Sequence, residues 1–94
     1  MHLTQEQSNS VEQCAYRLIP PSLIAVNIEV DEFDFMTDLR IPGTDVFRSF
    51  YRGYVSQLIE CREAIIKTAK NGSNPAQMEL LKMIREMNNL IKYE

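Results

Sequence analysis

The chain has 94 residues, which is enough for one small domain with a modest core. Apolar residues make up 45% of the sequence and charged residues 24%, the composition of a folded soluble protein. No apolar run approaches the roughly 20 residues that a helix needs to span a membrane, and the polar N-terminus does not resemble a signal peptide. Cys14 and Cys61 form no CxxC pair and have no nearby histidine, so we expect two reduced and partly buried thiols in a cytoplasmic protein.

The net charge of -3 is unevenly distributed along the chain. Residues 1–43 contain seven acids and two bases, a net charge of -5, and residues 44–94 contain eight bases and six acids, a net charge of +2. Neither part has the basic excess of a protein that binds nucleic acid by charge alone.

The first 43 residues predict three short helices. The first runs from about Gln5 to Leu18, because Thr4 and Gln7 form a capping box and apolar residues follow at helical spacing. Pro20-Pro21 ends it, since proline suits a helix start and not an interior, and a second helix covers Ser22 to Ile28.

The third helix covers about Glu32 to Leu39. Asp31 is a suitable N-cap, and the acids Glu32 and Asp34 lie where the helix dipole is positive. Phe33 lies off the apolar face of this helix. Three residues share that face: Phe35, Met36 and Leu39.

Two long helices complete the chain. Thr44-Asp45 caps one that extends to about Lys70, where Asn71-Gly72 ends it by a left-handed C-cap. The other runs from Pro75 to about Lys92. The sequence contains no segment with the pattern of a β-strand. The predicted fold is all-α: a tri-helical helix-turn-helix unit over 1–43, then a long antiparallel helical hairpin over 44–94, together in one compact domain.

The helix-turn-helix prediction depends on spacing. In such a unit a small residue on the first helix lets the second approach, and an apolar residue after the turn fixes the corner. Ala25 is the small residue, Ile28 is the buried one three positions later, and Val30 is the corner residue. Glu29 stands where glycine is common in the tight turn. Because any tri-helical unit can contain an Ala-x-x-Ile spacing, the pattern alone leaves open whether this unit is a helix-turn-helix or another three-helix arrangement.

The hairpin carries more apolar surface than its own interface needs. Exposed contiguous apolar surface usually marks an interaction site, so we expect self-association. The residues expected at the oligomer interface are Tyr54, Leu58, Ile65, Met83, Met87, Leu90 and Ile91. The alternative is that the last helix folds back and is covered by the first.

A weaker feature is a basic strip. Arg48 and Arg52 are four apart on one helix face, Arg40 precedes them, and Tyr51 and Tyr54 lie alongside. Arginines beside aromatic rings can hold phosphate or a single strand.

A simpler interpretation of the strip, which the sequence favours, is that these arginines lie on a solvated face and pair with Asp34 or Asp38 of the acidic helix. Capping does not explain Asp38, so we expect it to pair with an arginine.

Catalysis has little support. The only histidine is His2, in the terminal segment, and the three glycines (Gly43, Gly53 and Gly72) are isolated. The sequence has no Ser-His-Asp set, no metal-ligand cluster and no phosphate-cradling loop. We therefore expect a protein that is not an enzyme and has no cofactor or metal.

Three segments resemble the small terminase subunits of tailed bacteriophages and related prophage proteins. The run IPPSLIAVNIEVDEFDFMTDL resembles the family's helix-turn-helix. Tyr51-Arg52-Gly53-Tyr54 resembles its Y-x-x-G opening of a long helix. The segment AKNGSNPA at 69–76 resembles its closing A-x-x-G-(S/D/N)-x-x-A turn. The resemblance covers roughly residues 11 to 92.

The resemblance implies a non-catalytic DNA-packaging protein in the cytoplasm of a bacterial host. Such a protein recognises double-stranded viral DNA, assembles as a ring through its hairpin and hands the DNA to a large terminase subunit. The implied recognition-helix residues are Glu32, Phe33, Asp34, Thr37 and Asp38. The implied phosphate contacts are Arg40, Arg48 and Arg52.

The charge of the third helix departs from this pattern, because four acids (Asp31, Glu32, Asp34 and Asp38) precede its first base. An acidic side chain can accept a hydrogen bond from cytosine N4, but it gains nothing from phosphates. DNA binding would then be weak for each copy and strengthened by the number of copies. Two other functions stay open: a small dimeric helix-turn-helix transcriptional regulator, and a protein-interaction module that has lost DNA binding.

Overall fold

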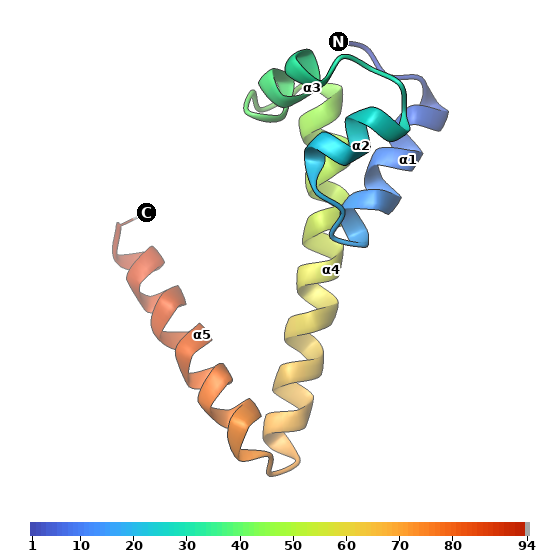
Figure 1. Cartoon of the computed structure of the whole chain (residues 1–94). Helices are drawn as coiled ribbons and strands as arrows, with labels where there is room; N and C mark the ends of the chain where they lie inside the picture. The colour runs from blue at the N-terminus through green and yellow to red at the C-terminus, as the bar shows by residue number, and fades with distance from the viewer. Residues whose placement is uncertain (94) are drawn as a thin grey trace. The chain divides into compact units, whose positions relative to one another are not determined.

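The computed structural model describes residues 1–93, which form five α-helices and no strand (Figure 1). The predicted all-α class is therefore confirmed. The helices are α1 (Gln5–Tyr16), α2 (Pro21–Asn27), α3 (Glu32–Leu39), α4 (Asp45–Lys70) and α5 (Asn74–Tyr93). The chain divides into two compact units, Met1–Leu58 and a second that starts at Ile59. The first unit contains α1 to α3 and the first half of α4, and the second contains the last turns of α4 and α5.

The helices begin where local side-chain chemistry predicts. The Thr4 side chain accepts a hydrogen bond from the Gln7 backbone N–H at 3.0 Å, and the Gln7 side chain accepts one from the Thr4 N–H at 3.0 Å. This capping box starts α1 as predicted. Asp31 Oδ1 accepts from the Asp34 N–H at 2.9 Å and starts α3, also as predicted.

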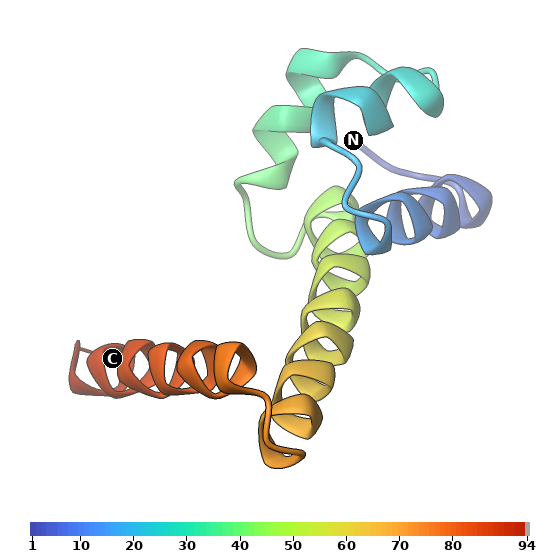
Figure 2. The same ribbon diagram turned by 60° about the horizontal axis from the view of Figure 1, so that its bottom comes forward.

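The core of the first unit lies where α1, α2 and α3 surround the first half of α4 (Figures 1 and 2). Phe35 is fully buried and Leu39 is 8% exposed, whereas Phe33 is 78% exposed, so the predicted division of α3 into two faces is correct. The buried residues of this core are Val11, Ala15, Ile24, Ala25, Phe35, Leu39, Val46 and Phe50.

Gly53 sits at the closest approach of α1 to α4. A Cβ atom at this position would lie 2.0 Å from the carbonyl oxygen of Glu12, a distance that no real Cβ contact tolerates. One turn along, the Gln57 side-chain amide donates a hydrogen bond to the Tyr16 carbonyl at 2.8 Å. The end of α1 is therefore fixed on α4 by a steric fit and a polar contact.

Two helices of the first unit end in the left-handed conformation on residues other than glycine. Leu18, after α1, has φ +62°, and Glu29, after α2, has φ +58°. At the second site the Glu29 N–H donates to the Val26 carbonyl at 3.2 Å and the Val30 N–H donates to the Ala25 carbonyl at 3.1 Å. This double hydrogen bond is the Schellman motif, in which glycine normally occupies the left-handed position.

The second unit is built around the turn that joins α4 to α5. Gly72 has φ +98°, its N–H donates to the Ala69 carbonyl at 3.1 Å, and the Ser73 N–H donates to the Thr68 carbonyl at 3.3 Å. The predicted left-handed C-cap at Asn71-Gly72 is therefore confirmed. The Gln77 side chain also donates to the Ala69 carbonyl, at 3.0 Å. Ala69 is buried, but α5 itself contains no buried residue.

Replacing Gly53 with alanine should destabilise the first unit by about 1–3 kcal/mol or more, because the added methyl group would force α1 away from α4. The measurement is urea unfolding followed by circular dichroism. Ser56→Ala, on the exposed side of α4, is the matched control and should change stability by less than about 0.5 kcal/mol. Equal stability of Gly53→Ala and the wild type would contradict the close approach.

Replacing Glu29 with glycine should stabilise the protein by about 0.5–1 kcal/mol. The left-handed conformation costs a residue with a side chain about 1–2 kcal/mol, more than the chain entropy that glycine adds to the unfolded state. Chemical denaturation measures the change. Val26→Gly, within α2, removes helix propensity without relieving strain and should destabilise instead. A Glu29→Gly variant that is less stable than the wild type would refute the left-handed conformation of residue 29.

Candidate nucleic-acid interface and assembly surface

The outward face of α3 is acidic with one large ring at its centre. Glu32, Phe33, Asp34 and Thr37 are all exposed. These four belong to the predicted recognition helix, and the fold leaves them accessible. The Asp31 carboxylate accepts the N-cap hydrogen bond from the Asp34 backbone N–H, which accounts for Asp31 without a ligand, and the Asp34 side chain lies in the first turn, where the helix dipole favours an acid.

A shallow hollow lies beside Phe33 on this face, and the sequence did not predict it. Its lining combines apolar, hydroxyl and charged groups: Glu32, Phe33, Met36, Thr37 and Arg40. The i, i+4 spacing from Phe33 to Thr37 and from Met36 to Arg40 would have indicated a shared surface. It could not have indicated a hollow, because the depth depends on how α3 packs on the core.

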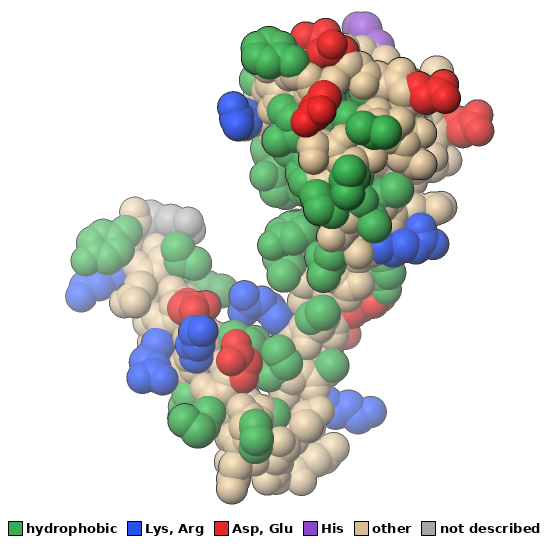
Figure 3. All heavy atoms as spheres, in the orientation of Figure 1, with side chains coloured by type: hydrophobic (Ala, Val, Ile, Leu, Met, Phe, Trp, Pro, Cys, Tyr) green, Lys and Arg blue, Asp and Glu red, His purple; other side chains and the backbone are tan. Residues whose placement is uncertain are grey.

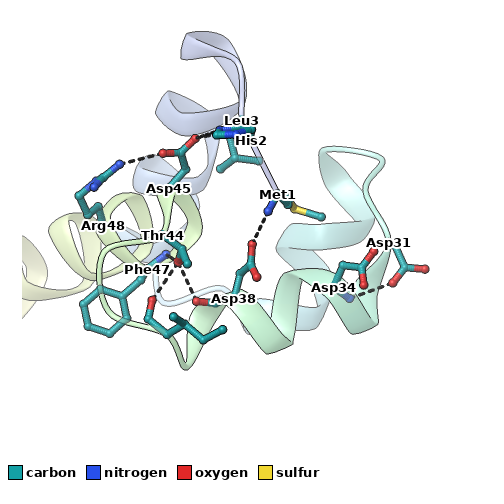
Figure 4. A network of polar contacts seen from close by, with 11 residues as sticks. Met1, His2, Leu3, Asp31, Asp34, Asp38, Thr44, Asp45, Phe47 and Arg48 are labelled. Atoms are coloured by element: carbon teal, nitrogen blue, oxygen red, sulfur yellow. Dashed lines mark hydrogen bonds and ion pairs between the residues drawn. The ribbon is translucent and has the colours of Figure 1, made fainter.

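Asp38, the remaining residue of the predicted recognition helix, pairs with the chain terminus (Figure 4). Its Oδ2 lies 2.7 Å from the Met1 ammonium. The hydrogen bond to Asp38 raises the pKa of that amino group above its ordinary value of 8.0. The prediction that Asp38 pairs with an arginine is therefore wrong, because the ammonium group of Met1 occupies its carboxylate.

The three predicted phosphate contacts differ in their surroundings. Arg48 donates through Nη2 to Asp45 Oδ1 and through Nη1 to the Gly43 carbonyl, both at 2.8 Å. Arg52 Nε lies 3.6 Å from a Glu12 carboxylate oxygen. Arg40 is exposed and forms no ion pair with any residue from 1 to 93.

The arginines of α4 therefore pair with acids, as the simpler interpretation expected, but with Asp45 and Glu12 and not with Asp34 or Asp38. The i, i+3 spacing brings Arg48 to the first acid of its own helix. The close approach of α1 to α4 brings Glu12 to Arg52. The side chains of Arg48 and Arg52 are 58% and 67% exposed, and Arg40 is also exposed. An anion such as a phosphate group can therefore still reach all three guanidinium groups.

Asp45 is the centre of the polar network that starts α4 (Figure 4). Its carboxylate accepts a hydrogen bond from the Leu3 backbone N–H at 3.1 Å, contacts Arg48, and lies 3.7 Å from His2 Nδ1. The Leu3 N–H, followed by the positive charge of Arg48, lowers the pKa of Asp45 below the ordinary 3.8. The network ties the N-terminal segment to α4.

The tyrosines of the predicted basic strip are engaged with other rings. The Tyr51 ring centroid lies 4.6 Å from that of Phe47 and 5.2 Å from that of Phe50. Tyr54 stacks on Phe50 at 6.1 Å and packs against the buried core. These contacts give both tyrosine rings a role in packing. Tyr51 is 38% exposed, whereas Tyr54 is half-buried.

The predicted assembly surface is only partly open in the single chain. Tyr54, Leu58, Ile65 and Met83 are half-buried, whereas Met87, Leu90 and Ile91 are 54%, 52% and 68% exposed. Three further apolar residues of α5 are also exposed and were not predicted for the interface: Met78, Leu81 and Ile84. Figure 3 shows apolar side chains at the surface of both units. Helical periodicity already placed Leu81 and Ile84 beside Leu80, so the signal for them was present in the sequence.

Replacing Asp45 with asparagine should remove part of the pH dependence of stability. Because the folded state lowers the pKa of Asp45, its charge stabilises the protein above about pH 4, and this contribution is lost as the pH falls through the lowered pKa. Wild type should therefore be more stable than Asp45→Asn at pH 7, and the difference should shrink by pH 3. Urea unfolding at both pH values tests this. A constant difference would show that the charge of Asp45 is not involved.

No protein-family model, curated protein or solved structure matches this chain. Among residues 1–93, no helix combines the length and apolarity needed to cross a bilayer. Over the same range, no cluster of three histidine, cysteine or acidic side chains could hold a metal ion. No disulfide joins Cys14 and Cys61 in this range; Cys14 is half-buried as expected, whereas Cys61 is exposed, so the expected partial burial is wrong for Cys61.

Proposed function

We propose that the protein is a non-catalytic assembly protein that resembles a small terminase subunit. In this proposal α2 and α3 form a helix-turn-helix that meets double-stranded DNA, and α4 and α5 form a helical hairpin that joins copies into an oligomer. The observation that carries the proposal is α5, a 20-residue helix with an apolar face and no buried residue. Such a helix needs a partner to cover it.

The turn between α2 and α3 supports the helix-turn-helix. Ala25 is fully buried in α2, and its carbonyl accepts the Val30 N–H that closes the turn. Glu29 takes the left-handed conformation that glycine usually supplies there. Phe35 buries the inner face of α3, which leaves the outer face free for a ligand. A small buried residue, a tight turn and an open second helix are the requirements of the motif.

The charges limit how such a unit would bind DNA. Glu32 and Asp34 offer no attraction to phosphate, and Arg48 and Arg52 would have to exchange their carboxylate partners for it. Of the three predicted phosphate contacts, Arg40, at the end of α3, is the one that can contact phosphate without losing an ion-pair partner. Binding by one copy should therefore be weak, and an oligomer would multiply it because several sites engage one duplex.

A protein-interaction module that has lost DNA binding is the second candidate. The pairings of Arg48 and Arg52 with acids favour it, and so does Phe33, 78% exposed beside a hollow on an acidic helix. An exposed aromatic ring is a common anchor for a protein partner. Acidic neighbours would select a basic partner over a polyanion.

The test titrates labelled double-stranded DNA with the full chain at several salt concentrations. In the proposed function, Arg40→Gln should weaken binding and reduce the slope of log affinity against log salt by about 1. Arg17→Gln is the matched control, because Arg17 is also exposed in the first unit and is not among the predicted contacts. It should leave the slope unchanged.

Light scattering on the same samples separates the alternatives. An assembly of several copies that binds DNA supports the proposed function. A stable dimer that binds DNA indicates the transcriptional regulator instead. An assembly without DNA affinity at low salt indicates the protein-interaction module, and a monomer at all concentrations refutes assembly through α5.

A further inference from the structure

The apolar face of α5 spans about half of the helix circumference. It consists of Leu80, Leu81, Met83, Ile84, Met87, Leu90 and Ile91, most of which follow one another at intervals of three or four residues. Only the residues near the turn to α4, such as Leu80 and Met83, are half-buried. The last two turns present Met87, Leu90 and Ile91 to solvent, each more than half exposed. A face this wide is the kind that a helix uses to contact more than one neighbour.

The charged residues of α5 border this face in a fixed order. Residues seven apart lie on the same side of a helix, so Arg85 and Lys92 form one border and Glu79 and Glu86 form the opposite border. All four side chains are exposed. None of them has an ion-pair partner within the described part of the chain. One edge of the apolar face is therefore basic and the other is acidic.

We propose that α5 pairs in parallel with α5 of a second copy, with the Arg85–Lys92 border of one copy facing the Glu79–Glu86 border of its neighbour. Two identical helices placed face to face in the same direction bring opposite borders together. The same helices placed antiparallel bring the basic borders together and the acidic borders together. Charges that flank an apolar seam set helix direction and partner choice, so the parallel arrangement is favoured.

This pairing rests on the self-assembly in the proposed function and specifies the partner and its direction. Each copy offers both a basic and an acidic border, so the contact can close as a dimer or continue from copy to copy around a ring. Lys82 lies in the middle of the polar side, away from the apolar face, and takes no part in the pairing. α3 and Arg40 are not part of this surface either, so variants of α5 leave the proposed DNA-contacting groups unchanged.

The test compares charge-reversal variants of the full chain by light scattering over a range of concentrations. Glu79→Lys/Glu86→Lys makes both borders basic, and Arg85→Glu/Lys92→Glu makes both acidic. Each should weaken assembly about tenfold at low salt, because attraction becomes repulsion at every contact. An equimolar mixture of the two variants should restore assembly. So should the variant with all four reversals, which keeps the wild-type net charge. Lys82→Glu is the control and should assemble as the wild type does.

The antiparallel arrangement gives a different result. Its like borders already repel in the wild type, so reversing one border leaves its energy unchanged. Wild-type assembly that either double reversal leaves intact would overturn the parallel pairing and leave the proposed function standing. A monomeric wild type would overturn both.

Cross-linking gives a reading that does not depend on charge. In a Cys14→Ser/Cys61→Ser background, Leu80→Cys should link to the same position of another copy through a short bismaleimide. In the same background, Leu80→Cys can be mixed with Ile91→Cys. A cross-link between these two variants, with no cross-link between two copies of Leu80→Cys, would refute the parallel direction.

Discussion

The contact between α1 and α4 at Gly53 is the constraint on which the first unit depends. The backbone of α1 reaches α4 only because position 53 carries no Cβ atom. That approach brings Val11 and Ala15 of α1 into the same buried cluster as Val46 and Phe50 of α4. α2 and α3 then cover the remaining side of that cluster with Ile24 and Phe35. A core this small contains few buried residues, so its formation depends on this one backbone contact.

Several charged groups of the first unit are engaged in contacts within that unit. Asp31 caps α3, Asp45 holds the Leu3 N–H and Arg48, and Glu12 meets Arg52. Part of the acidic net charge of residues 1–43 therefore serves helix starts and local pairs, whereas Glu32 and Asp34 stay exposed on α3. Arg17 and Arg40 are exposed cations of the first unit outside these pairs, and Phe33 is its most exposed large apolar side chain. These groups stay accessible to a partner.

The sequence predicted helix positions better than it predicted partners, for a physical reason. Helix starts are set by contacts three residues apart, so the caps at Thr4 and Asp31 could be recognised without a fold. The pairing of Asp38 with the Met1 ammonium joins residues 37 apart, and only the packed chain brings them together. Gly53 is part of the Tyr51-Arg52-Gly53-Tyr54 pattern in the sequence, but its steric role depends on the position of the Glu12 carbonyl in the folded chain. The wide apolar face of α5 was visible from periodicity, whereas its lack of buried residues was not.

The bond between Met1 and Asp38 makes the chemical state of the N-terminus part of the fold. Because the folded state raises the pKa of the amino group, its stabilising effect is present at and below pH 8.0 and is lost as the pH rises through the raised value. A formyl or acetyl group would remove the same charge at any pH. Without that charge, Asp38 near the end of α3 would lose its ion-pair partner, and the surface that carries Arg40 would be held less firmly.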